Sequence, residues 1–334
     1  MYDVPYHTKV LNKYTFLVTG GAGFIGSNIV GYLLKYGAKK VRVLDNFSTG
    51  SLENIKEFNN NPAFELIEGD IRDLETCHKA IAGVDYVTHQ AALGSVPRSI
   101  NDPVTSNEVN ISGFLNMLLA ARDAGVKRMI YAASSSTYGD HPGLPKVEDE
   151  IGNPLSPYAV TKYVNELYAS VFSKTYDFHT IGLRYFNVFG PKQNPEGPYA
   201  AVIPLFIEAA LKREAPYING DGETSRDFTF VENAVQANVK AMLAGEIKQH
   251  EVINIAYGER TTLNQLWKKI CSITNVDIAP EYREERKGDV KHSLADISKA
   301  KELVGYNPRF SALEGLYLAV EWYSENLKTA TGQA

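Results

Sequence analysis

The chain has 334 residues, of which 44% are hydrophobic and 22% are charged, a composition typical of globular proteins. Its formal charge of -5 includes no run of Lys or Arg, so a nucleic-acid or membrane-surface role has no support. Two distant cysteines, Cys77 and Cys271, make neither a disulfide framework nor a zinc site. The N-terminal segment 1–14 lacks the features of a signal peptide, and no apolar run reaches membrane-spanning length, so we expect a cytoplasmic protein without a metal.

Strands and helices alternate through the first half of the chain. Short apolar runs predict strands at 15–19, 40–45, 64–68, 85–89, 128–133 and 180–184. Longer amphipathic stretches predict helices at 24–36 and 104–124. This alternation indicates βαβ units and therefore a parallel sheet covered on both faces. Because such crossovers are right-handed, we expect an α/β fold with a doubly wound sheet.

The alternation ends near Asn187. Segment 188–198 is rich in Pro, Gly and Asn and is expected to be a loop. Beyond it the sequence predicts a helix at 203–212, a turn at 219–222, a strand at 251–256 and a helix that begins at the capping box Thr262–Gln265. We therefore expect a cofactor-binding domain over residues 1–187, to which parts of 230–260 return. A smaller, partly interleaved substrate lobe is expected over 188–334.

A glycine-rich turn joins the first strand to the first helix. Gly20, Gly23 and Gly26 permit a tight turn, let main-chain N–H groups approach a pyrophosphate and let the helix pack close to the strand. Asp45 ends the second strand, where an acid accepts hydrogen bonds from an adenosine ribose 2′-OH and repels a 2′-phosphate. The pattern favours NAD over NADP. An ordinary βα turn with a solvated Asp is the alternative.

Tyr158 and Lys162 lie one helical turn apart. Ser156 is a good N-cap and Pro157 suits the first helical position, so both side chains are expected on one face of a helix. An ammonium group beside a phenol favours phenolate and lowers the phenol pKa from about 10. Such a phenolate next to a nicotinamide could remove a proton from an alcohol while hydride leaves carbon. Taken alone, the pair could equally be a solvated helix surface.

The chain resembles the extended short-chain dehydrogenase/reductase family. Within it, the nucleotide-sugar 4-epimerases are most similar, in particular bacterial UDP-N-acetylglucosamine 4-epimerases of polysaccharide synthesis. The similarity extends from about Tyr14 to Tyr323 and rests on motifs at 19–26, 69–73, 89–92, 134–139, 158–162, 184–191, 226–228 and 286–289. This resemblance implies a Rossmann fold, tightly bound NAD, a UDP-sugar substrate and a homodimer.

The resemblance also implies roles for individual residues. Tyr158 would be the base, Lys162 would lower its pKa and Ser134 would assist. The cofactor contacts would be Gly20, Gly23, Phe24, Ile25, Gly26, Asp45, Asn46, Ser48, Thr49, Gly50, Asp70, Ile71, Gln90, Ala91, Ala92, Asn110, Tyr158, Lys162 and Tyr185. The substrate contacts would be Gly94, Ser95, Ser134, Ser135, Tyr158, Asn187, Ala201, Val202, Tyr217, Asn219, Arg226, Arg286, Asp289 and Ser293.

The implied substrate follows from a small side chain. Ser293 stands where the family carries a bulky Tyr in enzymes restricted to unacetylated hexoses, which favours UDP-GlcNAc and UDP-GalNAc over UDP-Glc and UDP-Gal. A UDP-glucose or UDP-glucuronate 4-epimerase is the alternative. A 4,6-dehydratase would need an Asp-Glu pair where Ser135 and Ser136 stand. An NAD-sensing regulator is the non-enzyme alternative, although such proteins tend to lose the Tyr/Lys pair.

Overall fold

A seven-stranded parallel sheet forms the centre of the larger part of the molecule. The computed structural model describes residues 1–195, 200–285 and 291–331. The strands are β1 (Thr15–Thr19), β2 (Lys40–Asp45), β3 (Phe64–Glu68), β4 (Tyr86–His89), β5 (Arg128–Ser134), β6 (Thr180–Tyr185) and β11 (Glu251–Ile255). Their order is β3-β2-β1-β4-β5-β6-β11, and every neighbouring pair is parallel. The predicted doubly wound α/β fold is confirmed. The strand order reverses between β1 and β4, where such sheets bind ligands at the carboxyl ends of the strands.

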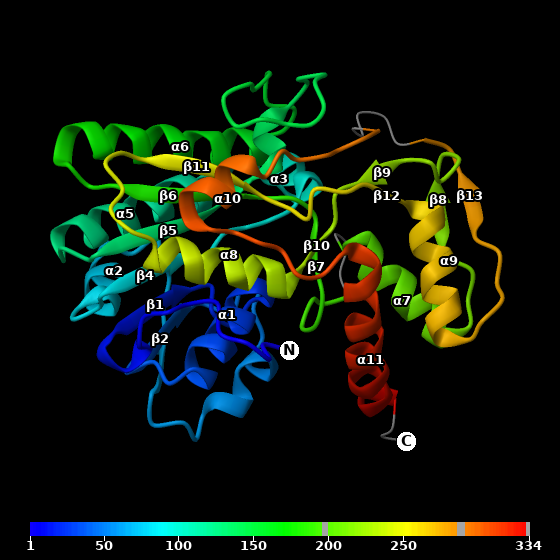
Figure 1. Ribbon diagram of the computed structural model, residues 1–334, viewed down its shortest axis with the longest axis horizontal. Coiled ribbons are helices and arrows are strands. Elements are labelled where there is room, and N and C mark those ends of the chain that lie inside the picture. The colour runs from blue at the N-terminus through cyan, green and yellow to red at the C-terminus, as the bar shows by residue number, and fades with distance from the viewer. Residues whose placement is uncertain (196–199, 286–290, 332–334) are drawn as a thin grey trace.

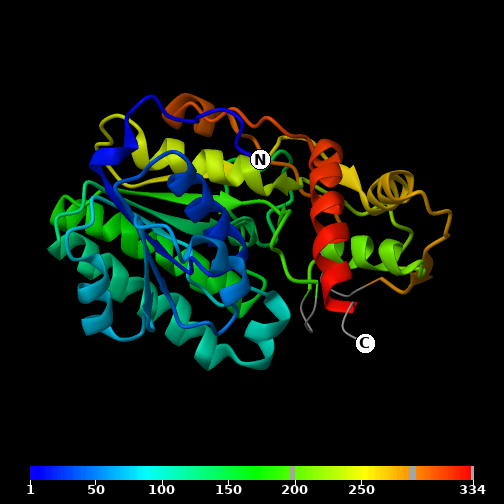
Figure 2. The ribbon, with the colours of Figure 1, turned by 90° about the horizontal axis from the view of Figure 1, so that it is seen from below.

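Helices cover both faces of this sheet (Figure 2). One face carries α1 (Phe24–Lys35), α8 (Val231–Leu243) and α10 (Ser298–Val304), and the other carries α2 (Leu74–Ile81), α5 (Phe114–Asp123) and α6 (Pro157–Tyr176). Side chains alternate between the two cores because successive residues of a strand point to opposite faces. Phe16 and Val18 pack toward α1, whereas Leu17 packs toward α5.

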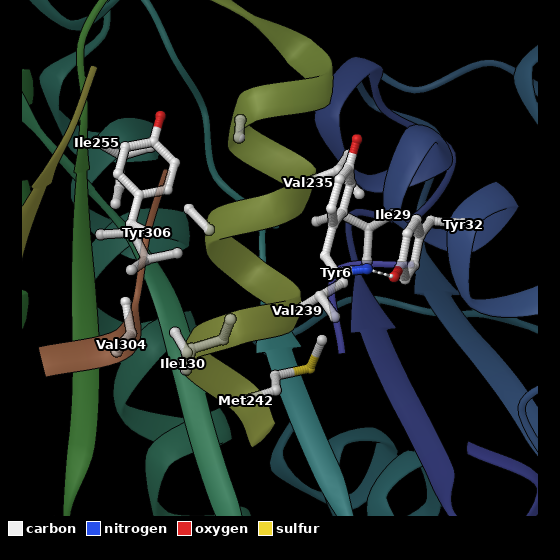
Figure 3. Close-up of a cluster of buried hydrophobic side chains, with 14 of the residues drawn as sticks. Tyr6, Ile29, Tyr32, Ile130, Val235, Val239, Met242, Ile255, Val304 and Tyr306 are labelled. Atoms are coloured by element: carbon white, nitrogen blue, oxygen red, sulfur yellow. Dashed lines mark hydrogen bonds between the residues drawn. The ribbon is translucent and has the colours of Figure 1, made fainter. Parts of the chain in front are cut away.

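The segment before β1 packs onto the face of the sheet that carries α1 and α8. In Figure 3, α8 lies between Tyr6 with Tyr32 on one side and Ile255 with Tyr306 on the other. The Tyr6 main-chain N–H donates to the Tyr32 hydroxyl at 2.7 Å, and their rings stack with centroids 5.3 Å apart. The Tyr2 hydroxyl donates to Asn28 Oδ1 of α1 at 2.9 Å. The N-terminal residues, to which the sequence assigns no role, therefore cover α1 and α8.

The connection from β4 to β5 contains the helical stretch predicted at 104–124. The structure has α3 (Val96–Asn101) and then an unbroken helical run of α4 (Pro103–Asn107), a π-helical turn at Glu108–Gly113 and α5. A side chain at Gly113 would approach Ile71 Cδ1 to 2.7 Å, so the π-helical turn lies close against the turn that follows β3. Short 3-10 turns occur at Leu11–Lys13, Leu52–Asn54, Lys56–Phe58 and Ser135–Tyr138.

The remaining elements form a smaller lobe beside the sheet (Figure 1). Its helices are α7 (Val202–Lys212), α9 (Leu263–Thr274) and α11 (Ala312–Thr331). Two-stranded pairs join β7 (Val188–Phe189) to β10 (Thr229–Phe230), β8 (Tyr217–Asn219) to β13 (Glu281–Arg283), and β9 (Ser225–Arg226) to β12 (Thr261–Thr262). Phe206, Trp267 and Leu316 lie in its separate core. The capping box predicted at Thr262–Gln265 is confirmed.

The chain leaves this lobe and returns to it. Between β10 and β12 it runs through α8 and β11, which belong to the layers of the large sheet, and the division into two domains stays a prediction. No described helix combines the length and apolarity that crossing a membrane requires.

Candidate active site

A cavity of about 540 Å³ lies at the carboxyl ends of the central strands. Its walls come from the glycine turn after β1, the ends of β2 to β6 and the first turns of α6. The predicted site residues that line it are Gly20, Gly23, Phe24, Ile25, Gly26, Asp45, Asn46, Ser48, Thr49, Asp70, Ile71, Gln90, Ala91, Ala92, Gly94, Ser95, Ser134, Ser135, Tyr158, Lys162, Tyr185 and Asn187. The topology thus gathers residues that are up to 167 positions apart (Gly20 to Asn187) around one cavity.

The glycine turn has room only for hydrogen at two positions. Gly20 has φ +66°, and a side chain there would lie 2.7 Å from the Ala91 main-chain nitrogen. A Cβ at Gly26 would lie 2.1 Å from the Gly20 carbonyl oxygen. Gly23 is the N-cap of α1 and makes no side-chain capping bond. The first N–H groups of α1 and its positive dipole end are therefore well suited to a pyrophosphate.

Acidic side chains stand at the end of β2 and just after β3. Asp45 accepts hydrogen bonds from the main-chain N–H of Ala22 and of Phe47, both at 2.9 Å, so it braces the glycine turn. Each of its oxygens keeps a lone pair for a ribose hydroxyl. Asp70 pairs with Arg72, whose hydrogen bonds hold the pKa of Asp70 at about 2. The glycine turn and these carboxylates fit the adenosine half of NAD. The Asp45 carboxylate also disfavours a 2′-phosphate.

A network of hydrogen bonds holds the polar side chains where the end of β6 borders the cavity. The Tyr185 hydroxyl donates to Gln90 Oε1 at 3.1 Å and accepts from Asn238 Nδ2 at 2.7 Å. Asn238 belongs to α8 and is not predicted by the sequence. Burial raises the pKa of Tyr185 well above its usual range, so this phenol stays protonated.

Two predicted cofactor contacts lie outside the lining. Asn110 is buried in the π-helical turn, where it accepts from the Leu93 N–H at 2.7 Å and donates to the Leu93 carbonyl at 3.0 Å. It therefore holds the loop after β4. A side chain at Gly50 would contact Ala22, which places Gly50 behind the glycine turn.

Helix α6 brings Tyr158 and Lys162 to the cavity. As predicted, Ser156 caps the helix by accepting from the Ala159 N–H at 3.1 Å, and Pro157 is in its first turn. The Tyr158 N–H donates to Ser99 Oγ at 3.0 Å, which anchors this turn to α3. Lys162 Nζ donates to the Ala132 carbonyl of β5 at 2.8 Å and lies 5.9 Å from the centre of the Tyr158 ring.

The protonation of this pair is set mainly by burial. Burial lowers the pKa of Lys162 to about 8. Burial also raises the pKa of Tyr158, while a hydrogen bond from Ser134 opposes that shift. In the protein alone, Ser134 is therefore the group that favours the Tyr158 phenolate. The lowering of the Tyr158 pKa by Lys162 stays a prediction for the enzyme with NAD bound.

The predicted substrate contacts in the smaller lobe are not among the residues that line this cavity, so their role stays a prediction. They are Ala201, Val202, Tyr217, Asn219, Arg226 and Ser293, whereas Arg286 and Asp289 lie outside the described residues. Arg226 Nη1 donates to the Lys291 carbonyl at 2.9 Å. Ser293 Oγ lies 3.5 Å from Asn187 Nδ2, which connects Ser293 to the cavity wall.

One structural residue of this region is missed by the sequence reasoning. Asp227 is buried and accepts hydrogen bonds from the main-chain N–H groups of Tyr257, Gly258 and Ala295, and burial raises its pKa to about 7. It thereby joins three segments that meet next to Ser293. The sequence signal for Asp227 is its position between Arg226 and Phe228, in the motif at 226–228. Among the residues that the structure describes, no cluster of His, Cys, Asp and Glu could hold a metal ion.

Comparisons with known proteins agree with this geometry. Residues 16–256 match the NAD dependent epimerase/dehydratase family. The chain therefore belongs to this NAD-dependent family, which confirms the resemblance and the cofactor.

Three relatives are similar over nearly their whole length. A UDP-N-acetylglucosamine 4-epimerase from Methanobrevibacter ruminantium M1, solved with UDP-N-acetylmuramic acid, is 41% identical with a TM-score of 0.88, covering 93% of this chain and 98% of that one. A UDP-glucose 4-epimerase from Thermotoga maritima, solved with UDP-glucose, is 40% identical with a TM-score of 0.87, covering 94% and 99%. A putative UDP-glucose 4-epimerase from Methanocaldococcus jannaschii is 37% identical, covering 94% and 99%.

Proposed function

We propose that the protein is an NAD-dependent UDP-sugar 4-epimerase that interconverts UDP-GlcNAc and UDP-GalNAc through a transient 4-keto sugar. The observation that carries this proposal is the placement of Ser134, Tyr158 and Lys162 on the wall of the cavity that also contains the glycine turn. The three side chains offer a hydrogen-bond donor, a base and a cation at one place. The names of the similar epimerases support the same class of reaction.

The proposed mechanism assigns one step to each side chain. The Tyr158 phenolate accepts the proton of the sugar C4 hydroxyl, and Ser134 donates a hydrogen bond to the C4 oxygen. Lys162, in its protonated form, supplies positive charge next to the phenolate. NAD, which the glycine turn would hold, would supply the hydride acceptor and donor for C4, and the 4-keto sugar would turn between the two transfers. The Tyr158 hydroxyl then gives its proton back, so no net oxidation occurs.

The substrate preference rests on space next to the cavity. Ser293 is close to Asn187, a lining residue, and its short side chain leaves room that a bulky residue would fill. An acetamido group needs such room. Sequence identity to relatives does not decide between an acetylated and an unacetylated substrate. The UDP-N-acetylglucosamine and UDP-glucose enzymes are 41% and 40% identical to this chain.

Replacing Ser293 by tyrosine is expected to lower kcat/KM for UDP-GlcNAc by roughly 10- to 100-fold, as overfilling a packed site typically does. Turnover of UDP-glucose should fall much less because this sugar lacks the acetamido group. Both rates would be measured on the same preparation, so the unacetylated sugar is the internal control for folding. An equal loss for both substrates, or no loss for UDP-GlcNAc, would refute the steric argument.

Specific features argue against the related activities. Ser135 and Ser136 offer hydroxyl groups where a dehydratase needs an acid and a base. A UDP-glucuronate enzyme would need cations for the sugar carboxylate, and of the described lining residues Lys162 alone is cationic. Its ammonium group already donates to Ala132. A non-catalytic NAD sensor would have no use for the Ser134, Tyr158 and Lys162 constellation.

We also propose that the enzyme is a homodimer formed through α6 and the helices of the β4–β5 connection. Val104, Leu167 and Val171 are 66%, 49% and 54% exposed, an unusual concentration of apolar side chains on neighbouring helices. Replacing Leu167 by glutamate is expected to convert the dimer to a monomer in sedimentation experiments, because it would bury a charge at the interface. A monomeric unmodified protein, or a dimeric Leu167→Glu variant, would reject this arrangement.

We place the protein in the cytoplasm. Cys77 and Cys271 are both free thiols, and burial raises the pKa of Cys77 to about 12, which makes it unreactive. Free thiols are compatible with a reducing compartment.

The direct test of the proposed function uses the purified protein and UDP-GlcNAc without added NAD. We expect UDP-GalNAc to form, with no net rise of absorbance at the NADH band. Accumulation of NADH would indicate a dehydrogenase, and a 4-keto-6-deoxy product would indicate a dehydratase.

A further inference from the structure

Ser134 forms an unusual pair of hydrogen bonds with a residue two positions further along the chain. It is the last residue of β5, and the chain then turns through the 3-10 helix Ser135–Tyr138. Ser134 Oγ accepts from the Ser136 main-chain N–H at 3.1 Å and from the Ser136 hydroxyl at 2.9 Å. A serine hydroxyl has two acceptor lone pairs and one proton to donate. Ser136 therefore occupies both lone pairs of Ser134.

Ser134 and Tyr158 lie on the wall of the same cavity. Ser134 lowers the pKa of Tyr158 against the effect of burial. Since Ser136 already uses the lone pairs of Ser134, Ser134 can act toward Tyr158 only as a donor. A phenolate accepts such a bond, whereas a neutral phenol would compete as a donor, so the direction of the bond selects the charged form of Tyr158.

We propose that Ser136 is a positioning residue: by filling both lone pairs of Ser134 Oγ, it leaves Ser134 only its single proton to offer, to Tyr158 before the sugar binds and to the C4 oxygen of the substrate afterwards. Ser136 is not among the residues that line the cavity. This inference rests on the proposed function, because that function gives Ser134 and Tyr158 their roles. It adds a residue that controls the direction of the hydrogen bond between them.

Removing the Ser136 hydroxyl frees one lone pair of Ser134. In a Ser136→Ala variant the Tyr158 hydroxyl can then donate to Ser134, which stabilises the neutral phenol. The apparent pKa of Tyr158 should rise by about half to one unit, the size expected for one hydrogen bond. At neutral pH, kcat should fall roughly 3- to 10-fold for the same reason, with KM for UDP-GlcNAc unchanged.

The test is a pH titration of the NAD-bound enzyme by ¹³C NMR with tyrosine labelled at Cζ. The Tyr158 signal is identified by its loss in a Tyr158→Phe variant, which matters because the chain has 20 tyrosines. The matched control is Thr137→Val in the same 3-10 turn. Thr137 Oγ1 is buried without a hydrogen-bond partner among the described residues, and valine keeps its shape.

We expect the Tyr158 titration to move to higher pH in Ser136→Ala and to be unchanged in Thr137→Val. An unchanged titration in Ser136→Ala, or an equal shift in both variants, would overturn the inference. The titration contains no sugar, so its outcome does not depend on which UDP-sugar is turned over. Failure of the proposed function would appear separately, as absence of UDP-GalNAc in the assay of the unmodified enzyme.

Discussion

Replacing Tyr158 by phenylalanine is expected to lower kcat for epimerisation by roughly 10²- to 10⁴-fold, the usual contribution of a general base. The substitution removes only the phenol oxygen and keeps the ring against α6 and the cavity wall. Tyr158 provides its main-chain N–H to Ser99, and this bond also remains. NAD should therefore stay bound, which can be measured by releasing the nucleotide from the purified protein and assaying it.

Tyr176 offers a matched control for this variant. It ends the same helix and is 49% exposed. Its ring packs on that of Phe172, with the ring centroids 4.9 Å apart. Tyr176→Phe keeps that ring contact and should leave kcat unchanged. An active Tyr158→Phe enzyme would show that another group takes the proton, and the assignment of the base would be wrong.

Replacing Gly26 by alanine is expected to abolish NAD retention. The new Cβ would lie 2.1 Å from the Gly20 carbonyl oxygen and 2.8 Å from the Gly21 Cα. Both are main-chain atoms, so the turn must move away from the start of α1 and the N–H groups that approach the pyrophosphate move with it. Forcing an extra carbon into a packed site costs about 1–3 kcal/mol, so the variant should also unfold at a lower temperature.

Gly245→Ala is the control for adding one methyl group. A Cβ at Gly245 would meet no atom within 4 Å, and the residue lies after α8, away from the cavity. The two variants would be compared for nucleotide content after purification and for melting temperature. If Gly26→Ala kept a full complement of NAD, the glycine turn could not be the site of close approach to the cofactor.

The sequence predicts the elements of the sheet well because each is a short apolar run between turn residues. The bounds of β1, β2 and β3 agree with those expected, and the N-cap of α6 was identified from Ser156 and Pro157 alone. The glycine turn and Asp45 are adjacent to strand ends, so their position at one edge of the sheet follows from strand direction.

Features that depend on tertiary contact could not be predicted. The helical periodicity predicts one stretch at 104–124 but does not reveal the π-helical turn at Glu108–Gly113 within it. Asp227 joins segments that lie 30 and 68 residues further along the chain. The local pattern around Tyr158 indicates an ammonium neighbour, but the structure shows that burial opposes the expected pKa shift and that Ser134 favours the phenolate.

The most direct test of the proposed reaction follows the hydrogen on C4 of the sugar. UDP-GlcNAc labelled with deuterium at C4 would be incubated with the enzyme in ordinary water, and the product examined by NMR and mass spectrometry. If Tyr158 takes only the hydroxyl proton while the carbon-bound hydrogen leaves and returns within the site, UDP-GalNAc should retain the deuterium at C4. Loss of the label to solvent would show that the carbon-bound hydrogen is exchanged as a proton, and it would contradict this account.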